Sequence, residues 1–251
     1  MKSDRIIAID IGNSATDLGL FSGANLLKYD FLPSLPEYSE KLCHIIESWK
    51  TGLEHVVIGS VVPSLGDLLE TMLVERRGDS PMMVEDFKTE LLPLRVDRPE
   101  TVGVDRIVNC YAVKHLFTLP AIVISLGTAT TFEAISSNGE YLGGAIVPGI
   151  KISLDSLTQR TALLPPVAIE KPKNIIGKNT LDHMKSGVYF GALSMMEGMV
   201  MRFRSKLGDH ASVIGVGGLS KLFAEEGLFD HHEPYLNLKG LELIHRHRCR
   251  R

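Results

Sequence analysis

The sequence has few cysteines and no long apolar run, and these absences exclude several classes of protein. Its three cysteines, Cys43, Cys110 and Cys249, are widely spaced and odd in number, which argues against a disulfide framework and favours a reducing compartment. No apolar run approaches the ~20 residues of a membrane-spanning helix. Asp4 and Arg5 stand beside a first apolar run that is too short for a signal peptide. We therefore expect a cytoplasmic protein.

The chain also lacks an excess of charge of either sign. It has 27 Lys and Arg against 30 Asp and Glu, a formal net charge of −3 at pH 7. This balance gives no electrostatic reason to expect nucleic acid or an anionic membrane as a partner. Hydrophobic residues at 44% and charged residues at 23% are ordinary for a globular protein. A length of 251 residues allows one large domain or two of about 120 residues each.

Two apolar runs each lead into a glycine-centred turn rich in hydroxyl groups. The first covers residues 6–14 and the second, a looser echo, residues 122–131. Each is followed by a short apolar stretch, 18–21 and 132–135, so each predicts a strand-turn-strand hairpin. A glycine in such a turn lets backbone N–H groups approach an anion. Either run alone fits an ordinary buried strand and turn, but one copy in each half suggests two halves closing on one polyphosphate.

The hairpin shape separates these runs from the better-known phosphate loops, which lead from a strand into a helix. Two other segments are near misses. Residues 177–180 lack Ser or Thr directly after Lys178, and residues 215–220 have Ser220 where the third glycine of a dinucleotide fingerprint belongs.

The hydrophobic periodicity predicts the same order of elements in both halves, as expected of two α/β half-domains covering residues 1–117 and 118–251. In the first half we expect helices over 38–49, 65–75 and 107–116 and a strand over 56–63. In the second half we expect strands over 141–149 and 212–216, helices over 151–160 and 181–207, and an irregular segment over 163–179. Gly217 and Gly218 after the last strand predict either a close backbone approach or a tight turn.

His231, His232 and the tail 245–251 could be drawn as a metal site. Nothing in the sequence fixes their geometry, so we expect the tail to be a solvated, frayed end.

Seven segments, in order, resemble the type III pantothenate kinases, members of the superfamily of actin, sugar kinases and Hsp70. They are residues 10–14, 103–106, 127–131, 143–149, 161–165, 176–180 and 186–191. The resemblance spans nearly the whole chain. It implies an α/β protein of two related half-domains with the actin-like ATPase (ribonuclease H-like) fold and a cleft between them.

The resemblance also implies the activity, which is ATP-dependent phosphorylation of pantothenate to 4′-phosphopantothenate, the first step of coenzyme A synthesis. It assigns ATP to Asp10, Ile11, Gly12, Asn13, Ser14, Ala15, Thr16, Asp17 and Thr128, and pantothenate to Gly103, Val104, Asp105, Arg106 and Thr180. Asp10 would place Mg²⁺ through water, and Asp105 would accept the proton.

These roles are physically reasonable, because phosphoryl transfer mainly requires positioning and compensation of developing charge. Arg106 would hold Asp105 ionised and offer a cation to the carboxylate of pantothenate. The family also implies a homodimer whose partner completes the pantothenate pocket. The methionines of helix 181–207, Met195, Met196, Met199 and Met201, could supply that interface or simply a core.

Three positions depart from the family. Ser125 replaces an Asp that binds an activating K⁺ or NH₄⁺ ion, Val216 replaces a Thr, and the tail lacks the family's asparagine. We therefore expect little dependence on a monovalent cation, or dependence only at high concentration. Ser125 also favours an alternative, a catalytically decayed nucleotide-binding regulator on the same fold, which the intact segment 103–106 opposes. A sugar kinase is a second alternative, although the scattered cysteines exclude those with a zinc-binding cluster.

Overall fold

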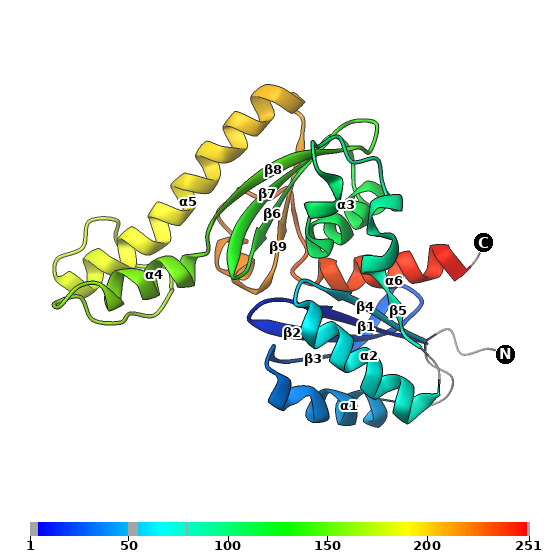
Figure 1. Cartoon of the computed structure of the whole chain (residues 1–251). Helices are drawn as coiled ribbons and strands as arrows, with labels where there is room; N and C mark the ends of the chain where they lie inside the picture. The colour runs from blue at the N-terminus through cyan, green and yellow to red at the C-terminus, as the bar shows by residue number, and fades with distance from the viewer. Residues whose placement is uncertain (1–4, 50–54, 79, 250–251) are drawn as a thin grey trace. The chain divides into compact units, whose positions relative to one another are not determined.

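The computed structural model describes residues 5–49, 55–78 and 80–249 and divides the chain into two compact units (Figure 1). The first contains residues 1–116 and 236–251, and the second contains residues 117–235. Each is built on one five-stranded sheet with helices, so the expected α/β class is correct. The boundary lies one residue from the expected one. Residues 236–249, which the sequence suggested belong with the second half, pack instead with the first unit.

The first unit has the strand order β3-β2-β1-β4-β5. Its strands are β1 (Arg5–Ile11), β2 (Ala15–Ser22), β3 (Asn25–Pro33), β4 (His55–Ser60) and β5 (Met82–Met83). Strand β1 pairs antiparallel with β2 and parallel with β4, which confirms the predicted hairpin and the strand after it. Strand β3 was not predicted, because this edge strand carries mostly exposed residues and no continuous apolar run.

Helices cover both faces of this sheet (Figure 1). The helices are α1 (Ser39–Ser48), α2 (Pro63–Arg77), α3 (Val104–Leu116) and α6 (Leu236–Cys249), with 3₁₀ turns η1 (Pro36–Tyr38), η2 (Val84–Glu90) and η3 (Pro99–Thr101). Helices α1 and α2 share a buried core with Ile7, Ile9 and Ile11 of β1. Because side chains alternate along a strand, Ala8 and Asp10 point to the opposite face, where α6 contacts β1. Asp10 therefore lies on the α6 side of the sheet.

Small residues allow α6 to lie close against this face. A Cβ atom added at Gly19 would lie 3.1 Å from Leu238, and one at Gly59 would lie 3.1 Å from Leu241. On its other side, a Cβ at Gly240 of α6 would lie 2.7 Å from both Val108 Cγ1 and the Val108 carbonyl oxygen of α3. Such close packing on both sides explains why the end of the chain belongs to the first unit.

The expectation of a solvated tail is wrong for residues 245–247, whereas Arg248 and Cys249 are exposed as expected. His245 is 5% exposed and its ring centroid lies 5.0 Å from that of His55. The Tyr111 hydroxyl lies 2.8 Å from His247 Nδ1. Residues 236, 238, 241 and 244 are apolar at helical spacing and bury the helix despite its basic end. Arg250 and Arg251 lie outside the described residues.

The second unit has the strand order β10-β9-β6-β7-β8 and repeats the hairpin of the first. Its strands are β6 (Ala121–Leu126), β7 (Ala129–Ile135), β8 (Tyr141–Pro148), β9 (Ser212–Val216) and β10 (His231–His232). Its helices are α4 (Ile150–Gln159) and α5 (Thr180–Leu207), with the 3₁₀ turn η4 (Gly218–Phe223). Helix α5 shares a core with β6 and β9.

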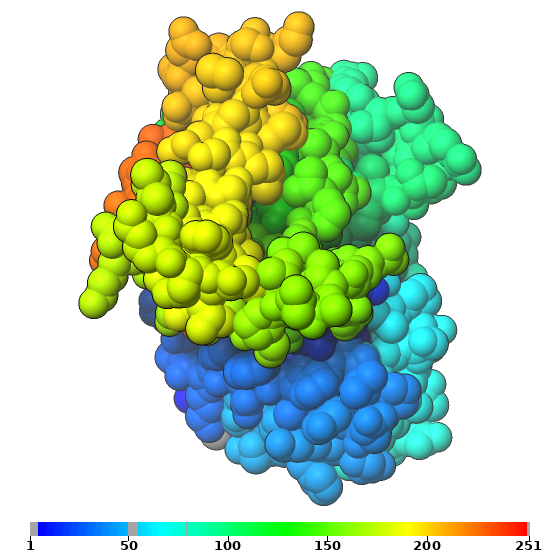
Figure 2. Space-filling view, turned by 90° about the vertical axis from the view of Figure 1, so that its left-hand side faces the viewer, coloured from blue at the N-terminus to red at the C-terminus, as the bar shows by residue number. Residues whose placement is uncertain are grey.

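The segment 160–179 between α4 and α5 forms no helix or strand, which confirms the irregular segment predicted over 163–179. Figure 2 shows it against the N-terminal part of α5. Helix α5 begins after Asn179, whose side chain accepts a hydrogen bond of 3.0 Å from the Asp182 N–H. This is an N-cap, which satisfies a backbone donor that the helix itself leaves free. Among the described residues, no helix is long and apolar enough to cross a membrane.

Candidate active site

The turn between β1 and β2 is the first predicted phosphate turn, residues 12–14. The Gly12 N–H donates to the Ala15 carbonyl oxygen at 3.0 Å, and a Cβ at Gly12 would lie 3.0 Å from that same oxygen. A larger residue would therefore push the turn open. Asn13 and Ser14 at its tip are exposed. Glycine at position 12 thus favours a tight, outward-facing turn of the kind that suits an anion.

A residue that sequence reasoning missed supports this turn from behind. The Ser34 N–H donates to the Ser14 carbonyl oxygen at 3.2 Å, and the Ser34 hydroxyl lies 2.9 Å from the Thr16 hydroxyl. Ser34 follows the unpredicted strand β3, so no local pattern marked it. These two contacts tie the loop after β3 to the phosphate turn.

Two carboxylates stand opposite each other beside the turn. Asp10 of β1 is the register partner of Asp17 of β2, and directly opposed residues of an antiparallel pair place their side chains on the same face. The Tyr29 hydroxyl donates to Asp17 at 2.5 Å. Burial raises the pKa of Asp17, while this hydrogen bond from Tyr29 lowers it. Opposed like charges destabilise a sheet, so this pair favours a cation.

Burial, the first cause, and the charges of Asp105 and Asp17 raise the pKa of Asp10 from 3.8 to about 8. The side-chain amide of Asn237 acts the other way, because its Nδ2 donates to Asp10 Oδ2 at 2.8 Å. Asn237 lies at the start of α6, and no sequence signal connected it to the site. The charge of Glu85 adds to the rise. The first unit therefore gathers several carboxylates that are costly to ionise together in the absence of a cation.

The carboxylates around Asp10 fit an Mg²⁺ ion that is bound to the phosphates of a nucleotide. Within the described residues, no group of three or more His, Cys, Asp or Glu side chains is arranged to hold a metal ion by itself. Mg²⁺ in kinases usually takes one or two carboxylates and completes its octahedron with water and substrate phosphate oxygens. Asp10 beside a phosphate turn meets that requirement.

The residues next to Asp105 in the chain fix its carboxylate at the start of α3. A Cβ at Gly103 would lie 2.6 Å from Asp105 Oδ1, so glycine is needed for the carboxylate to fold back over the helix start. Burial, the largest cause, raises the pKa of Asp105, although the Arg106 N–H and the Arg106 guanidinium lower it. Arg106 was expected to hold this group ionised; in the folded unit the neighbouring cation does lower the pKa, but desolvation raises it by more. A raised pKa makes a carboxylate a better proton acceptor near neutral pH.

Lys88 of η2, which the sequence analysis did not single out, secures the loop before Gly103. Its Nζ donates to the Val102 carbonyl oxygen at 2.7 Å and to the Glu100 carbonyl oxygen at 3.1 Å. Its positive charge also lowers the pKa of Asp105 slightly. A side chain from a 3₁₀ turn thus fixes the approach to Asp105.

The second predicted phosphate turn, residues 127–128 between β6 and β7, is one residue shorter than the first. The Gly127 N–H donates to the Ala129 carbonyl oxygen at 3.1 Å, and Thr128 is exposed. A Cβ at Gly149 would lie 2.2 Å from the Thr128 carbonyl oxygen, so only glycine fits where the backbone after β8 meets this turn. Two glycine-bearing segments together shape this turn.

Gly217 and Ser125 lie close to this turn along their strands. Gly217 has φ +87°, and a Cβ there would lie 2.8 Å from the Leu126 carbonyl oxygen. The close backbone contact expected at Gly217 is therefore with Leu126 of the same chain. Ser125 near the end of β6 is in register with Thr131 on one side and Val216 on the other. No carboxylate occupies any of these three positions.

Thr180, the first residue of α5, lines a cavity of about 640 Å³ in the second unit. The cavity lies among β8, α4 and α5, and Ser153, Thr180 and His183 supply polar side chains to an otherwise largely apolar lining. Thr128 and Ser125 do not line it. The structure thus places Thr180 in a different feature of this unit from the phosphate turn.

Comparison with solved structures defines the class of protein through its fold. The chain matches a protein from Campylobacter jejuni described as a Baf family transcriptional activator, with a TM-score of 0.63 and 20% identity, over 98% of this chain and 100% of that one. It also matches MreB 5 of Spiroplasma citri bound to AMPPNP, with a TM-score of 0.56 and 11% identity, over 100% and 98%. A protein from Sinorhizobium meliloti described as a 2-dehydro-3-deoxygalactonokinase gives a TM-score of 0.59 and 13% identity, over 97% and 96%. These likenesses show the fold shared by actin-like ATPases and sugar kinases.

Sequence comparison is more specific. The family model for type III pantothenate kinase matches residues 6–202. A type III pantothenate kinase of Moorella thermoacetica is 39% identical over 249 residues, covering 96% of this chain and 98% of the relative. One of Dehalococcoides mccartyi strain CBDB1 is 37% identical over 252 residues, covering 97% and 96%. The chain therefore belongs to the type III pantothenate kinase family, and it is a kinase.

Proposed function

We propose that this kinase transfers the γ-phosphoryl group of ATP to the primary hydroxyl of pantothenate, with Asp105 as the general base. Membership of the family supports pantothenate and ATP as the substrates, in the service of coenzyme A synthesis. The observation that carries the assignment of the base is the geometry of Asp105. It is a partly buried carboxylate held over Gly103 at a helix start, with burial raising its pKa and Arg106 adjacent.

Each residue then has a distinct task. The Asp105 carboxylate takes the proton of the pantothenate hydroxyl as the oxygen bonds to the γ-phosphorus and the β,γ-bridging oxygen leaves with ADP. The phosphate turns at Gly12 and Thr128 hold ATP phosphates, and Gly103, Val104 and Arg106 contact pantothenate. When bound, Mg²⁺ supplies compensation for the phosphate charge, and Asp10 would hold it through water.

A coupled assay of ADP release tests this function. We would measure the rate with pantothenate, with glucose and with no acceptor. Release that requires pantothenate supports the proposal, and release that requires glucose would favour a sugar kinase instead. Nucleotide binding without turnover on either acceptor would favour the catalytically decayed regulator, the alternative that Ser125 suggests.

Arg106→Lys is expected to raise the Michaelis constant for pantothenate by about 10-fold, because a planar guanidinium binds a carboxylate through two parallel hydrogen bonds and an ammonium does not. The Michaelis constant for ATP should change less than twofold. Initial rates measured against each substrate in turn separate the two effects. An equal rise for both substrates would mean that Arg106 supports the structure around Asp105 rather than contacting pantothenate.

Ser125 is expected to make the enzyme nearly independent of potassium, or dependent only at high concentration. A hydroxyl offers a cation a dipole where a carboxylate offers a full charge. Ser125→Asp should restore saturation at low potassium. Activity titrated with KCl, with NaCl holding the ionic strength constant, decides this. If the wild type saturates at low potassium and Ser125→Asp changes nothing, other groups hold the cation.

We also propose that a second copy of this chain covers the cavity beside α5 and completes the pantothenate pocket with Thr180. A Cβ at Gly187 or Gly191 would meet nothing within 4 Å, so this face of α5 is open. Leu157 is exposed and lines the same cavity. Other large apolar residues are exposed in the same unit: Ile146, Leu163, Ile176 and Met201. A smooth glycine face with an apolar border suits close helix packing.

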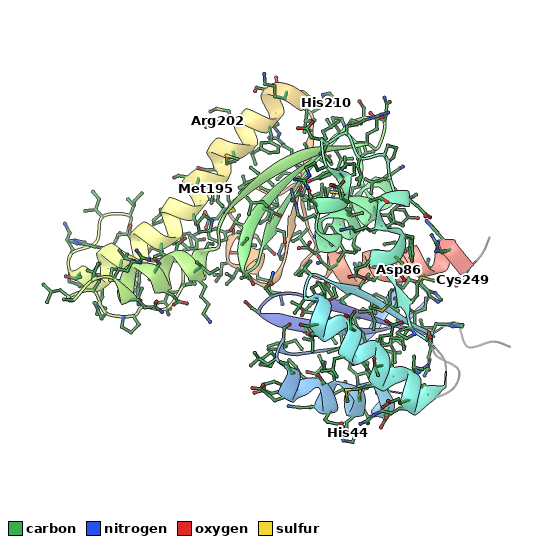
Figure 3. The ribbon with its side chains drawn as sticks, in the orientation of Figure 1. His44, Asp86, Met195, Arg202, His210 and Cys249 are labelled. Atoms are coloured by element: carbon green, nitrogen blue, oxygen red, sulfur yellow. The ribbon has the colours of Figure 1, made fainter. Side chains whose placement is uncertain are left out.

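The methionines suggested for this interface divide between core and surface. Met196 is fully buried, Met195 and Met199 pack against the core, and Met201 is 64% exposed. Met196 is thus a core residue and not an interface residue. Figure 3 labels Met195 and Arg202 along this helix.

Gly187→Leu is expected to convert a dimer into a monomer and to abolish pantothenate binding. Leucine favours a helix interior over glycine by about 1 kcal/mol, so the unit should remain folded. Light scattering should give twice the chain mass of 27.6 kDa for the wild type and the mass of one chain for the variant. ATP binding should be retained. A fully active wild-type monomer would refute the shared pocket.

A further inference from the structure

We propose that Asn237 is a positioning residue of the nucleotide site, whose side-chain amide holds the Asp10 carboxylate in the orientation that receives the metal-bound nucleotide. The inference rests on the proposed function for the role of Asp10 toward Mg²⁺ and ATP. Asn237 lies 227 residues from Asp10 in the sequence and none of the recognised motifs includes it. Its side-chain amide donates to Asp10, so we infer that it acts through Asp10.

Asp10 needs an external group to fix its orientation. The terminal torsion of an aspartate side chain is broad and roughly two-fold, so the backbone alone does not select one position of the carboxylate. Its register partner Asp17 bears the same charge and can only repel it. Asn237 Nδ2 donates to Oδ2 of Asp10 at 2.8 Å, a hydrogen bond that becomes charge-assisted when the carboxyl group is ionised. This hydrogen bond fixes the terminal torsion of Asp10, which the strand backbone alone does not fix.

The amide is itself held on a rigid element. Leu236 and Leu238, on either side of Asn237, are 0% and 1% exposed. Gly240, one turn along α6, packs too closely against Val108 of α3 for any side chain. The first turn of α6 therefore cannot shift relative to β1 without disrupting the core on both sides. A group placed on such an element positions its partner more precisely than one on a loop.

The chemical type of the donor also fits this role. A lysine or arginine at position 237 would neutralise Asp10 and compete with Mg²⁺ for the carboxylate. A neutral amide fixes the group and leaves its negative charge for the metal. Carboxylates that serve metals are commonly held in this way by a second hydrogen-bonding partner, and loss of that partner typically costs 10–100-fold in metal affinity.

The test measures nucleotide binding by titration calorimetry without pantothenate, so that no turnover occurs. We would determine the dissociation constant of ATP with Mg²⁺ and with EDTA for the wild type and for Asn237→Leu, which keeps the branched shape but donates no hydrogen bond. The gain in affinity that Mg²⁺ gives should fall by about 10-fold in the variant. Asn25→Leu, at an exposed position at the start of β3, is the matched control and should behave as the wild type.

A double mutant separates positioning from a general structural effect. In the Asp10→Asn background, Asn237→Leu should cause no further loss of the Mg²⁺ response, because the partner that it orients has lost its charge. Asn237→Asp, which keeps the size and polarity, should reduce the response as the leucine variant does, and it serves if the leucine variant does not fold.

Two results would overturn the role of Asn237. One is a full Mg²⁺ response in both Asn237 variants, and the other is an equal additional loss in the Asp10→Asn background. The proposed function is tested by a separate result. A wild type that binds ATP with Mg²⁺ but phosphorylates no pantothenate would refute the function and leave the Asn237 result intact.

Discussion

Asp105→Asn is expected to reduce turnover with pantothenate by about 10²–10⁴-fold, the usual cost of losing a general base. The asparagine has the same shape, so it can still fold back over Gly103 and lie at the start of α3. It cannot accept the hydroxyl proton. The dissociation constant for ATP should therefore change little, because the phosphate turn at Gly12 is untouched. Steady-state rates and calorimetric ATP binding on the same preparation measure the two effects.

The control for this experiment is Asp86→Asn, which changes a neighbouring exposed carboxylate of η2 and should leave the rate unchanged (Figure 3). The pH dependence adds a second check. Because burial raises the pKa of Asp105, the wild-type rate should fall as pH decreases through that raised value, and the residual rate of the variant should not. Retention of more than about a tenth of the wild-type rate would exclude Asp105 as the base.

The sequence predicted those parts of the fold that repeat a local pattern. The two hairpins with turns at Gly12 and Gly127 could be predicted because each joins a buried apolar strand to a hydroxyl-rich turn. Helix α5 was located to within one residue, since it was predicted over 181–207 and begins at Thr180. Asp105 was visible because it follows Gly103 in a recognisable segment and opens a periodic helix.

The remaining features depend on contacts between distant parts of the chain, and no local pattern records them. Asn237 became relevant only because α6 packs against Gly19 and Gly59. Lys88 lies in a 3₁₀ turn whose sequence is unremarkable, yet it binds the carbonyl groups before Gly103. The effect of burial on the pKa of Asp105 was also not predicted. Arg106 is visible beside it in the sequence, whereas the burial that outweighs this cation is a property of the folded unit.

Asp10 is expected to lower the stability of the protein for the sake of its function, so Asp10→Asn should raise the melting temperature while it weakens nucleotide binding. In the folded unit the pKa of Asp10 is about 8, against an ordinary value of 3.8. Between these two values the folded state holds more protons than the unfolded state, so the stability contributed by this group falls as pH rises from about 4 to about 8. Asparagine does not ionise and removes that slope.

At pH 8 and without Mg²⁺, we expect the variant to be more stable than the wild type by about 2–4 kcal/mol, which is several degrees for a protein of this size. At pH 5 the difference should be much smaller, because Asp10 is then protonated in the folded state. Melting curves recorded in EDTA across this range measure it, with Asp67→Asn at an exposed position of α2 as the control. Adding Mg²⁺ and ATP should stabilise the wild type strongly and the variant weakly, since only the carboxylate attracts the metal. A variant that melts below the wild type at pH 8 in EDTA would show that the Asp10 carboxylate stabilises the fold, contrary to this account.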